Sequence, residues 1–214
     1  MPDYGWNENA GRYVNLDTGR FVSSSTVRDA LESVMESSAI NMNAISQQLL
    51  NSEISLAQWQ TGMMNEIKLA HTAAAASANG GWAQMTQSDW GFTGRLIRTQ
   101  YEHLERFANQ IANGEQALNG QILFRADLYG QAARGTYESQ RQRLEAANGM
   151  NEERRILEKD GANCQGCLEQ AELGWQPIGT LDPIGAEECL TNCRCEFEYR
   201  KIEDGEFVTS DEQE

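Results

Sequence analysis

The amino-acid sequence predicts a mainly α-helical fold: a helical bundle of about four helices, preceded by a short hairpin-like segment and followed by a small cysteine-rich region. Three observations predict this organisation. Apolar residues recur at three-to-four spacing over most of 26–150, which is typical of amphipathic helices. Aromatic and turn residues alternate before that stretch, and all five cysteines follow it. We therefore divide the chain into 1–25, 26–150, 151–201 and an acidic tail at 202–214.

The N-terminal segment from Trp6 to Ser25 is predicted to form two short extended stretches around the turn Asp17-Thr18-Gly19. Glycine tolerates positive φ and aspartate can bond to its own backbone, and both properties suit such a turn. A lone hairpin of this size is barely stable in water, so we expect it to lie on its own helices or on a partner. Because exposed aromatic side chains need cover, the preferred partner-binding residues are Trp6, Tyr13 and Phe21.

Two helices are expected in the first half of the central domain. The first runs from Thr26, a plausible N-cap, to about Asn51. The second begins at Ser55, which forms a capping box with Gln58 three residues further on. Alanines continue this helix until the glycine stop at 79–81.

Two more helices are expected in the second half of the domain, at about 92–112 and 115–147. Gly120, Gly130 and Gly135 interrupt the last of them, and each costs up to ~1 kcal/mol relative to alanine inside a helix. The helix is therefore expected either to bend at these glycines or to use them for close packing against another helix.

Composition excludes several classes of protein. The 32 acidic and 17 basic residues give a net charge of −15, which opposes binding to nucleic acid because phosphates are gripped mainly by Lys and Arg. The mean hydropathy is −0.60, and the longest uncharged run, Leu69–Ser88, contains polar residues and a Gly-Gly break. We therefore expect neither a membrane span nor a membrane partner. The first residues lack the basic and apolar regions of a signal peptide, and the tail is expected to be a solvated terminus.

The cysteines form two groups, Cys164-x2-Cys167 and, after 21 residues, Cys189-x3-Cys193-x-Cys195. Each group can bring two thiolates to one cation, and Zn²⁺ needs four ligands at the corners of a tetrahedron. The intervening loop is rich in glycine and proline, so a metal crosslink would stabilise a region too small to build a sufficient core. The sequence therefore predicts a zinc-knuckle region with a structural zinc bound by Cys164, Cys167, Cys189 and either Cys193 or Cys195.

Other states of these cysteines remain open at this point. The thiols could be free and reduced, or paired as disulfides, and disulfides gain weight if the protein matures in an extracellular particle. A catalytic zinc is not expected, because four protein ligands leave no open position. Four thiolates around Zn²⁺ carry a net charge of −2, which Arg194 and Lys201 are expected to offset.

At these residues the chain resembles the minor head proteins of tailed bacteriophages, the head-morphogenesis family whose members sit with the portal. Their C-terminal signature is Cys-x-x-Cys, followed at a distance by His-Pro-x-x-Cys-x-Cys. The matching segments are CQGC and CLTNCRCEFEYR, with Cys189 where the family has histidine. Two further stretches look like phage structural proteins of the same type, AGRYVNLDTGRFVSSSTVRDAL and GGWAQMTQSDWGFTGRLIRTQYEHL.

The resemblance implies a structural or assembly protein of the phage head, made in the host cytoplasm and located in the virion at the head or portal vertex. Its partners would be the portal protein, the major capsid protein or both, with several copies per particle. The rival interpretation is a nucleic-acid-binding zinc module, because Arg194, Arg200 and Lys201 lie beside the knuckle. Glutamates in the same region oppose contact with phosphates.

An enzyme is not expected. The sequence contains no HExxH, no glycine-rich phosphate loop and no G-x-S-x-G. Its two histidines, His71 and His103, fall on predicted helices, with His71 semi-buried or exposed. Glu152 and Glu153 are interpreted as a helix start or a solvated pair rather than as a catalytic dyad.

Overall fold

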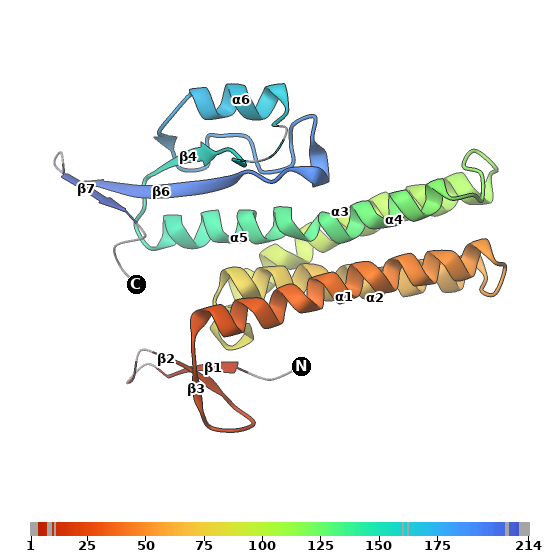
Figure 1. Cartoon of the computed structure of the whole chain (residues 1–214), viewed down its shortest axis with the longest axis horizontal. Helices are drawn as coiled ribbons and strands as arrows, with labels where there is room; N and C mark the ends of the chain where they lie inside the picture. The colour runs from red at the N-terminus through yellow and green to blue at the C-terminus, as the bar shows by residue number, and fades with distance from the viewer. Residues whose placement is uncertain are drawn as a thin grey trace. The chain divides into compact units, whose positions relative to one another are not determined.

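The computed structural model describes residues 4–7, 10, 12–159, 161, 163–203 and 206–209. The chain forms two compact units, Met1–Tyr137 and Glu138–Glu214. The prediction of a mainly helical protein with small N-terminal strands is confirmed (Figure 1). The predicted C-terminal cysteine cluster is present as well. Among the described residues, no helix is both long enough and apolar enough to cross a lipid bilayer.

The N-terminal segment is a small antiparallel sheet with the strand order β1-β2-β3. Its strands are β1 (Tyr4–Asn7), β2 (Arg12–Asn15) and β3 (Phe21–Val22), one more than the two predicted. The expected turn links β2 to β3, with Gly19 at a φ of +67°. Tyr4, Tyr13 and Val22 pack with apolar residues of the first two helices, so this sheet lies on its own helices.

Helices α1 (Ser24–Leu50) and α2 (Leu56–Ala78) pack against each other. The predicted capping box is present: the Ser55 side chain accepts a hydrogen bond from the Gln58 backbone N–H, and the Gln58 side chain accepts one from the Ser55 backbone. A short 3₁₀ helix, η1 (Trp82–Gln84), follows α2.

Helix α3 (Gln87–Ala112) begins earlier than predicted, because Thr86 is its N-cap and forms a capping box with Asp89. The predicted fourth helix is divided at Ala132 into α4 (Gln121–Gln131) and α5 (Ala133–Ala147). Gly130 allows α4 to approach α1 closely, because a Cβ on it would lie 2.7 Å from the Cβ of Ala39.

The core of the N-terminal unit joins α1, α2, α3 and α4 around Trp59. The Trp59 and Phe107 rings meet edge to face, with centroids 5.3 Å apart. The Trp59 indole N–H donates to the Oγ of Ser46 at 2.9 Å, which satisfies a polar group that is fully buried. The core is therefore a close-packed contact between helices of the bundle.

The C-terminal unit contains a four-stranded antiparallel sheet that the sequence analysis did not predict. Its order is β5-β4-β6-β7, formed by β5 (Gln176–Pro177), β4 (Glu152–Ile156), β6 (Glu196–Glu203) and β7 (Glu206–Thr209). Helix α6 (Gln165–Glu172) and the 3₁₀ helix η2 (Leu190–Asn192) complete the unit. The expected acidic tail thus begins within β6, while positions 204, 205 and 210–214 lie outside the described residues.

The interpretation of Glu152 and Glu153 as a helix start or solvated pair is wrong, because both lie in β4. Side chains alternate between the two faces of a strand, and this places Glu153 in the interior. Glu153 is fully buried, and its carboxylate accepts hydrogen bonds from Gln142 Nε2 and from the backbone N–H groups of Gly179 and Leu181. Glu152 instead forms an ion pair with Arg200.

Candidate metal centre

The five cysteines come from three short elements of the C-terminal unit. Cys164 is the N-cap of α6, and Cys167 lies in the first turn of that helix. Cys189 and Cys193 flank η2, where Leu190 has a positive φ of 48° that closes a tight turn. Cys195 directly precedes β6. The two groups of cysteines that are separated in sequence thus meet at one place.

The sulfur atoms lie at distances typical of ligands of one cation. Cys167 Sγ is 3.6 Å from Cys189 Sγ and 3.7 Å from Cys193 Sγ. Four sulfurs at ~2.3 Å from a tetrahedral Zn²⁺ are about 3.8 Å from each other, whereas a disulfide joins two sulfurs at about 2.05 Å. All five thiols are free in this structure, and their geometry fits a metal site better than a disulfide.

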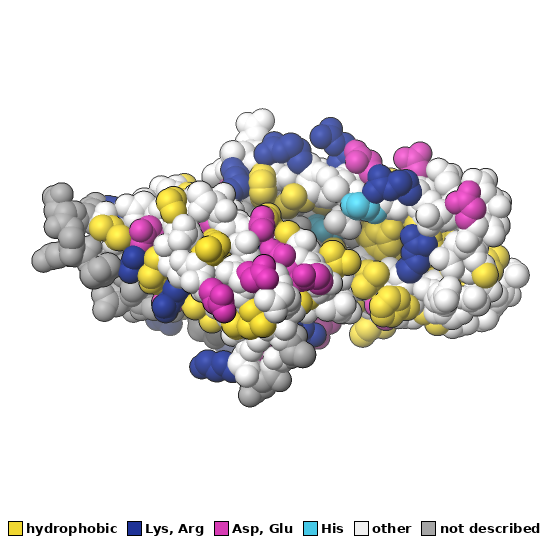
Figure 2. Space-filling model, turned by 90° about the horizontal axis from the view of Figure 1, so that it is seen from above, with side chains coloured by type: hydrophobic (Ala, Val, Ile, Leu, Met, Phe, Trp, Pro, Cys, Tyr) yellow, Lys and Arg dark blue, Asp and Glu magenta, His cyan; other side chains and the backbone are white. Residues whose placement is uncertain are grey.

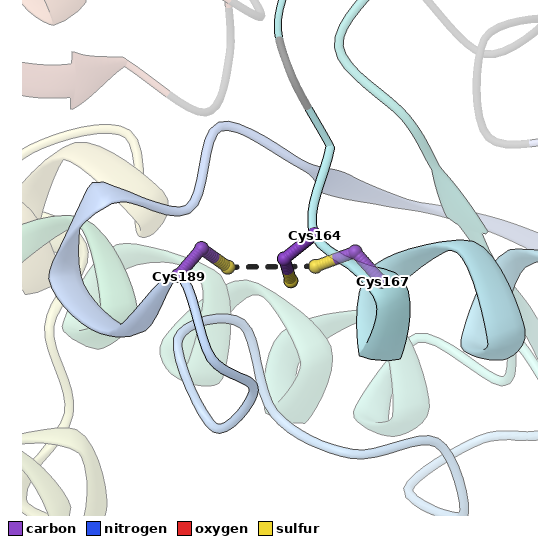
Figure 3. Close-up of side chains that lie close together, drawn as sticks. All are labelled: Cys164, Cys167 and Cys189. Atoms are coloured by element: carbon purple, nitrogen blue, oxygen red, sulfur yellow. Dashed lines mark hydrogen bonds between the residues drawn. The ribbon is translucent and has the colours of Figure 1, made fainter.

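Two overlapping sets of three ligands are present, and Cys167 belongs to both. The sulfurs of Cys164, Cys167 and Cys189 lie within 4.8 Å of one another, as do those of Cys167, Cys193 and Cys195. In Figure 3 the first set faces inward, with Cys164 and Cys167 on one side and Cys189 on the other. The cysteine cluster could therefore hold a metal ion, as predicted.

The cluster is also part of the hydrophobic core. Cys167, Cys193 and Cys195 are buried beside Phe197 and Tyr199. All five cysteines line one cavity of about 230 Å³ together with Glu158, Gly161, Asn163, Asn192 and Arg194. The five sulfurs thus face one cavity, which is lined by residues from 158–167 and from 189–195.

A buried arginine supplies positive charge to the cluster. Arg155 of β4 is 3% exposed, and its Nη1–H donates to Cys167 Sγ at 3.4 Å. Its Nη2–H donates to the carbonyl of Asp182, which fixes the guanidinium in place. The sequence analysis assigned charge compensation to Arg194 and Lys201 and did not identify Arg155, which lies in the charged run Glu152–Arg155. No local pattern in this run places Arg155 in the interior, because its position depends on the pairing of β4 with β6.

The glycine of CQGC, Gly166, contacts the glutamates that precede Cys189. A Cβ on Gly166 would lie 2.1 Å from Glu187 Oε2, so a side chain there would require the Glu187 carboxylate to move. The Gly166 N–H also donates to Glu188 Oε2 at 3.0 Å. The start of α6 and the 187–189 segment are thus in contact at Gly166, beside the cysteines that each of them carries.

Burial and hydrogen bonding both shift the pKa of the thiols, in the same direction at Cys167 and in opposite directions at Cys164 and Cys193. Burial raises the pKa of Cys167 far above its usual value, and burial also raises the pKa of Cys189 to about 12. Burial opposes ionisation of Cys164 and Cys193 too, but hydrogen bonds from backbone N–H groups and neighbouring thiols hold their pKa below the usual value. A bound cation would displace the protons from its ligand thiols, so metal binding and proton release are coupled here.

The other residues singled out from the sequence lie in the N-terminal unit. The Phe21 ring is 47% exposed and lies 5.2 Å from the guanidinium carbon of Arg12, whereas Tyr13 is half-buried against its own helices. The side chain of Trp6 lies outside the described residues.

The expectation that His71 is semi-buried or exposed is wrong: it is 1% exposed, with Nδ1 2.6 Å from Thr136 Oγ1. His103 is exposed.

No protein-family model, curated protein or solved structure matches this chain. Its function is therefore inferred from the geometry of the cysteine cluster and from the residues of the chain.

Proposed function

We propose that this chain is a structural or assembly protein of a bacteriophage head, whose C-terminal unit is held together by a zinc ion bound to four cysteine thiolates. The observation that supports the zinc site is the spacing of the sulfurs, with Cys167 Sγ at 3.6 and 3.7 Å from Cys189 and Cys193. These separations agree with the edges of a ZnS₄ tetrahedron. A site with four thiolate ligands and no open position is typical of structural zinc, whereas catalytic metals keep a position open for water or substrate.

The role proposed for the zinc is structural. Four thiolates fill the tetrahedral coordination of Zn²⁺ and leave no position for water or substrate. Cys167 and Cys193 lie in the core of a unit that begins at residue 138, so the metal would crosslink α6, η2 and the strand that follows. In a unit of this size, the free energy of metal binding supplies stability that apolar burial alone does not.

The assembly role rests on the resemblance of CQGC and CLTNCRCEFEYR to the C-terminal signature of phage minor head proteins. Docking onto portal or capsid proteins is assigned to the N-terminal sheet, where the Phe21 ring is exposed beside Arg12. An exposed aromatic ring with a neighbouring guanidinium is a common anchor of protein interfaces.

Contacts of the basic residues favour this role over nucleic-acid binding. Arg200 is paired with Glu152, and Arg154 with Glu198, so both guanidinium groups already have carboxylate partners. On the face drawn in Figure 2, acidic side chains lie among the basic ones. A gel-shift assay with DNA and RNA at low salt is expected to show no complex, and a complex would favour the rival function.

The assembly role is tested by quantitative mass spectrometry of proheads and virions of the phage that encodes the chain. The protein is expected in one or both particles, and its absence from both would eliminate the proposal.

Phe21→Ser is expected to reduce incorporation of the protein into these particles while the helix content is retained. The matched control is Phe124→Ser, which removes a phenylalanine that is 64% exposed on α4. Equal incorporation of both variants would contradict the assignment of Phe21.

A further inference from the structure

We infer that Cys193 and Cys195 are interchangeable as the fourth ligand of the metal site, so that the cluster carries its own replacement ligand. This inference rests on the proposed zinc site and goes beyond it, since a structural zinc needs only four of the five thiols. It predicts that the site retains its metal after the loss of either of these two cysteines and not after the loss of any other.

The geometry of the second set of ligands supports this inference. Cys193 and Cys195 are separated by one residue in an extended segment, so their side chains point to the same face. Both lie within 4.8 Å of Cys167 Sγ and of each other. Cys193 is 4% exposed and Cys195 is 2% exposed, so both thiols are kept inside the unit rather than in solvent.

The surroundings of the two thiols allow the exchange. Both line the same cavity of about 230 Å³ as the three other cysteines. The backbone N–H of Cys193 donates to the Leu190 carbonyl, which holds the η2 turn, and Cys195 Sγ is 3.8 Å from Asn163 Oδ1. The turn at η2 and the start of β6 thus hold both sulfurs beside one cavity, and the exchange that we infer moves only the side chains.

The exchange is a balanced ligand substitution. A new Zn–S bond forms to Cys195 as the Zn–S bond to Cys193 breaks, and the proton released by the Cys195 thiol is taken up by the Cys193 thiolate. The charge of the site and the number of bound protons are unchanged, and no oxidant or reductant is needed. Cys164, Cys167 and Cys189 have no such replacement in this arrangement, because the extra thiol lies beside Cys193 in the second set, at the place that Cys193 already fills.

Single serine substitutions at the five cysteines test this inference, with zinc per chain measured after purification in the presence of reductant and zinc. Cys193→Ser and Cys195→Ser are each expected to retain stoichiometric zinc, whereas the double variant loses it. Cys164→Ser, Cys167→Ser and Cys189→Ser are expected to lose it as single variants. Loss of zinc from Cys193→Ser but not from Cys195→Ser, or the reverse, would overturn the inference. Absence of zinc from the wild-type chain would instead contradict the proposed function itself.

A second measurement avoids the risk that a variant fails to fold. The zinc-loaded wild-type chain is treated with iodoacetamide under native conditions and then digested with trypsin, which cleaves after Arg194 and so separates Cys193 from Cys195. For chains that carry one label, we expect the label on the Cys193 peptide in one part of the population and on the Cys195 peptide in the rest. Label at only one of these two cysteines would overturn the inference.

Discussion

Nη1 of Arg155 lies 3.4 Å from Sγ of Cys167, and both side chains are buried. Arg155 is therefore a cation in direct contact with the sulfur that belongs to both sets of possible metal ligands. A zinc ion with four thiolates has an excess of negative charge, and a buried guanidinium stabilises it far more than a solvent-exposed one does.

Arg155→Met should weaken zinc binding by about tenfold or more, because a buried hydrogen bond to a charged group contributes roughly 1.5–3 kcal/mol. Arg155→Lys should lose less, since it keeps the charge. The zinc dissociation constant is measured by competition with a chelator of known affinity. The control is Arg194→Met, which removes an exposed basic residue beside the same cysteines. A larger effect of Arg194→Met than of Arg155→Met would show that charge compensation lies at the surface.

Removal of the metal should unfold the C-terminal unit and leave the helices of the N-terminal unit intact. Structural zinc contributes about 10–16 kcal/mol in small zinc-binding peptides, which is comparable with the whole stability of a domain. After chelation, hydrogen exchange at Phe197 and Tyr199 of β6 is expected to become fast, while exchange at Trp59 and Phe107 stays slow. Unchanged protection of β6 after complete removal of zinc would contradict a structural role for the metal.

The two helical glycines Gly130 and Gly94 should respond to alanine in opposite directions. Gly130→Ala should destabilise the N-terminal unit by about 1–2 kcal/mol, because its new Cβ meets Ala39 at 2.7 Å and overpacking outweighs the gain in helix propensity. Gly94→Ala should stabilise the unit by about 0.5–1 kcal/mol, since no atom lies within 4 Å of its Cβ position. Urea denaturation measures both changes, and a stabilising effect of Gly130→Ala would contradict close packing of α1 and α4.

Much of the helical unit could be predicted because its signals are local. Apolar periodicity and the capping box at Ser55 placed α2 to within a residue or two. The start of α3 at Gln87 was missed because its signal is a Thr86–Asp89 pair rather than the usual Ser/Thr with Glu/Gln. A bend or close packing was expected at the glycines of the last helix: the break at Ala132 lies between Gly130 and Gly135, and Gly130 packs closely against Ala39.

The sheet of the C-terminal unit was missed for a different reason. Its strands are rich in charged residues, so the segment around β4 was interpreted as solvated. Alternation is nevertheless present in β6 and the residue before it, with Cys195, Phe197 and Tyr199 buried and with Glu196, Glu198 and Arg200 between them. Spacing predicted which cysteines meet, but the position of Arg155 depends on the pairing of β4 with β6, which is not local.

The buried histidine of α2 makes the N-terminal unit sensitive to acid. Burial lowers the pKa of His71 to about 4, whereas the unfolded chain takes up that proton near pH 6.5. Below pH 6.5 the unfolded state therefore binds more protons, and stability falls by about 1.4 kcal/mol per pH unit until about pH 4. His71→Gln should remove this slope, measured as the free energy of unfolding between pH 4 and 7. His103→Gln, which removes the other histidine, is the control, and a slope that persists in His71→Gln would contradict the assignment.

The most direct test of the proposed zinc site is metal analysis combined with thiol counting on the wild-type chain, purified under reducing conditions. We expect one zinc per chain, four thiols protected from a thiol reagent until a chelator is added, and a single thiol that reacts before it. A chain with no stoichiometric metal and five reactive thiols, whose C-terminal sheet still resists hydrogen exchange, would contradict a zinc-stabilised C-terminal unit.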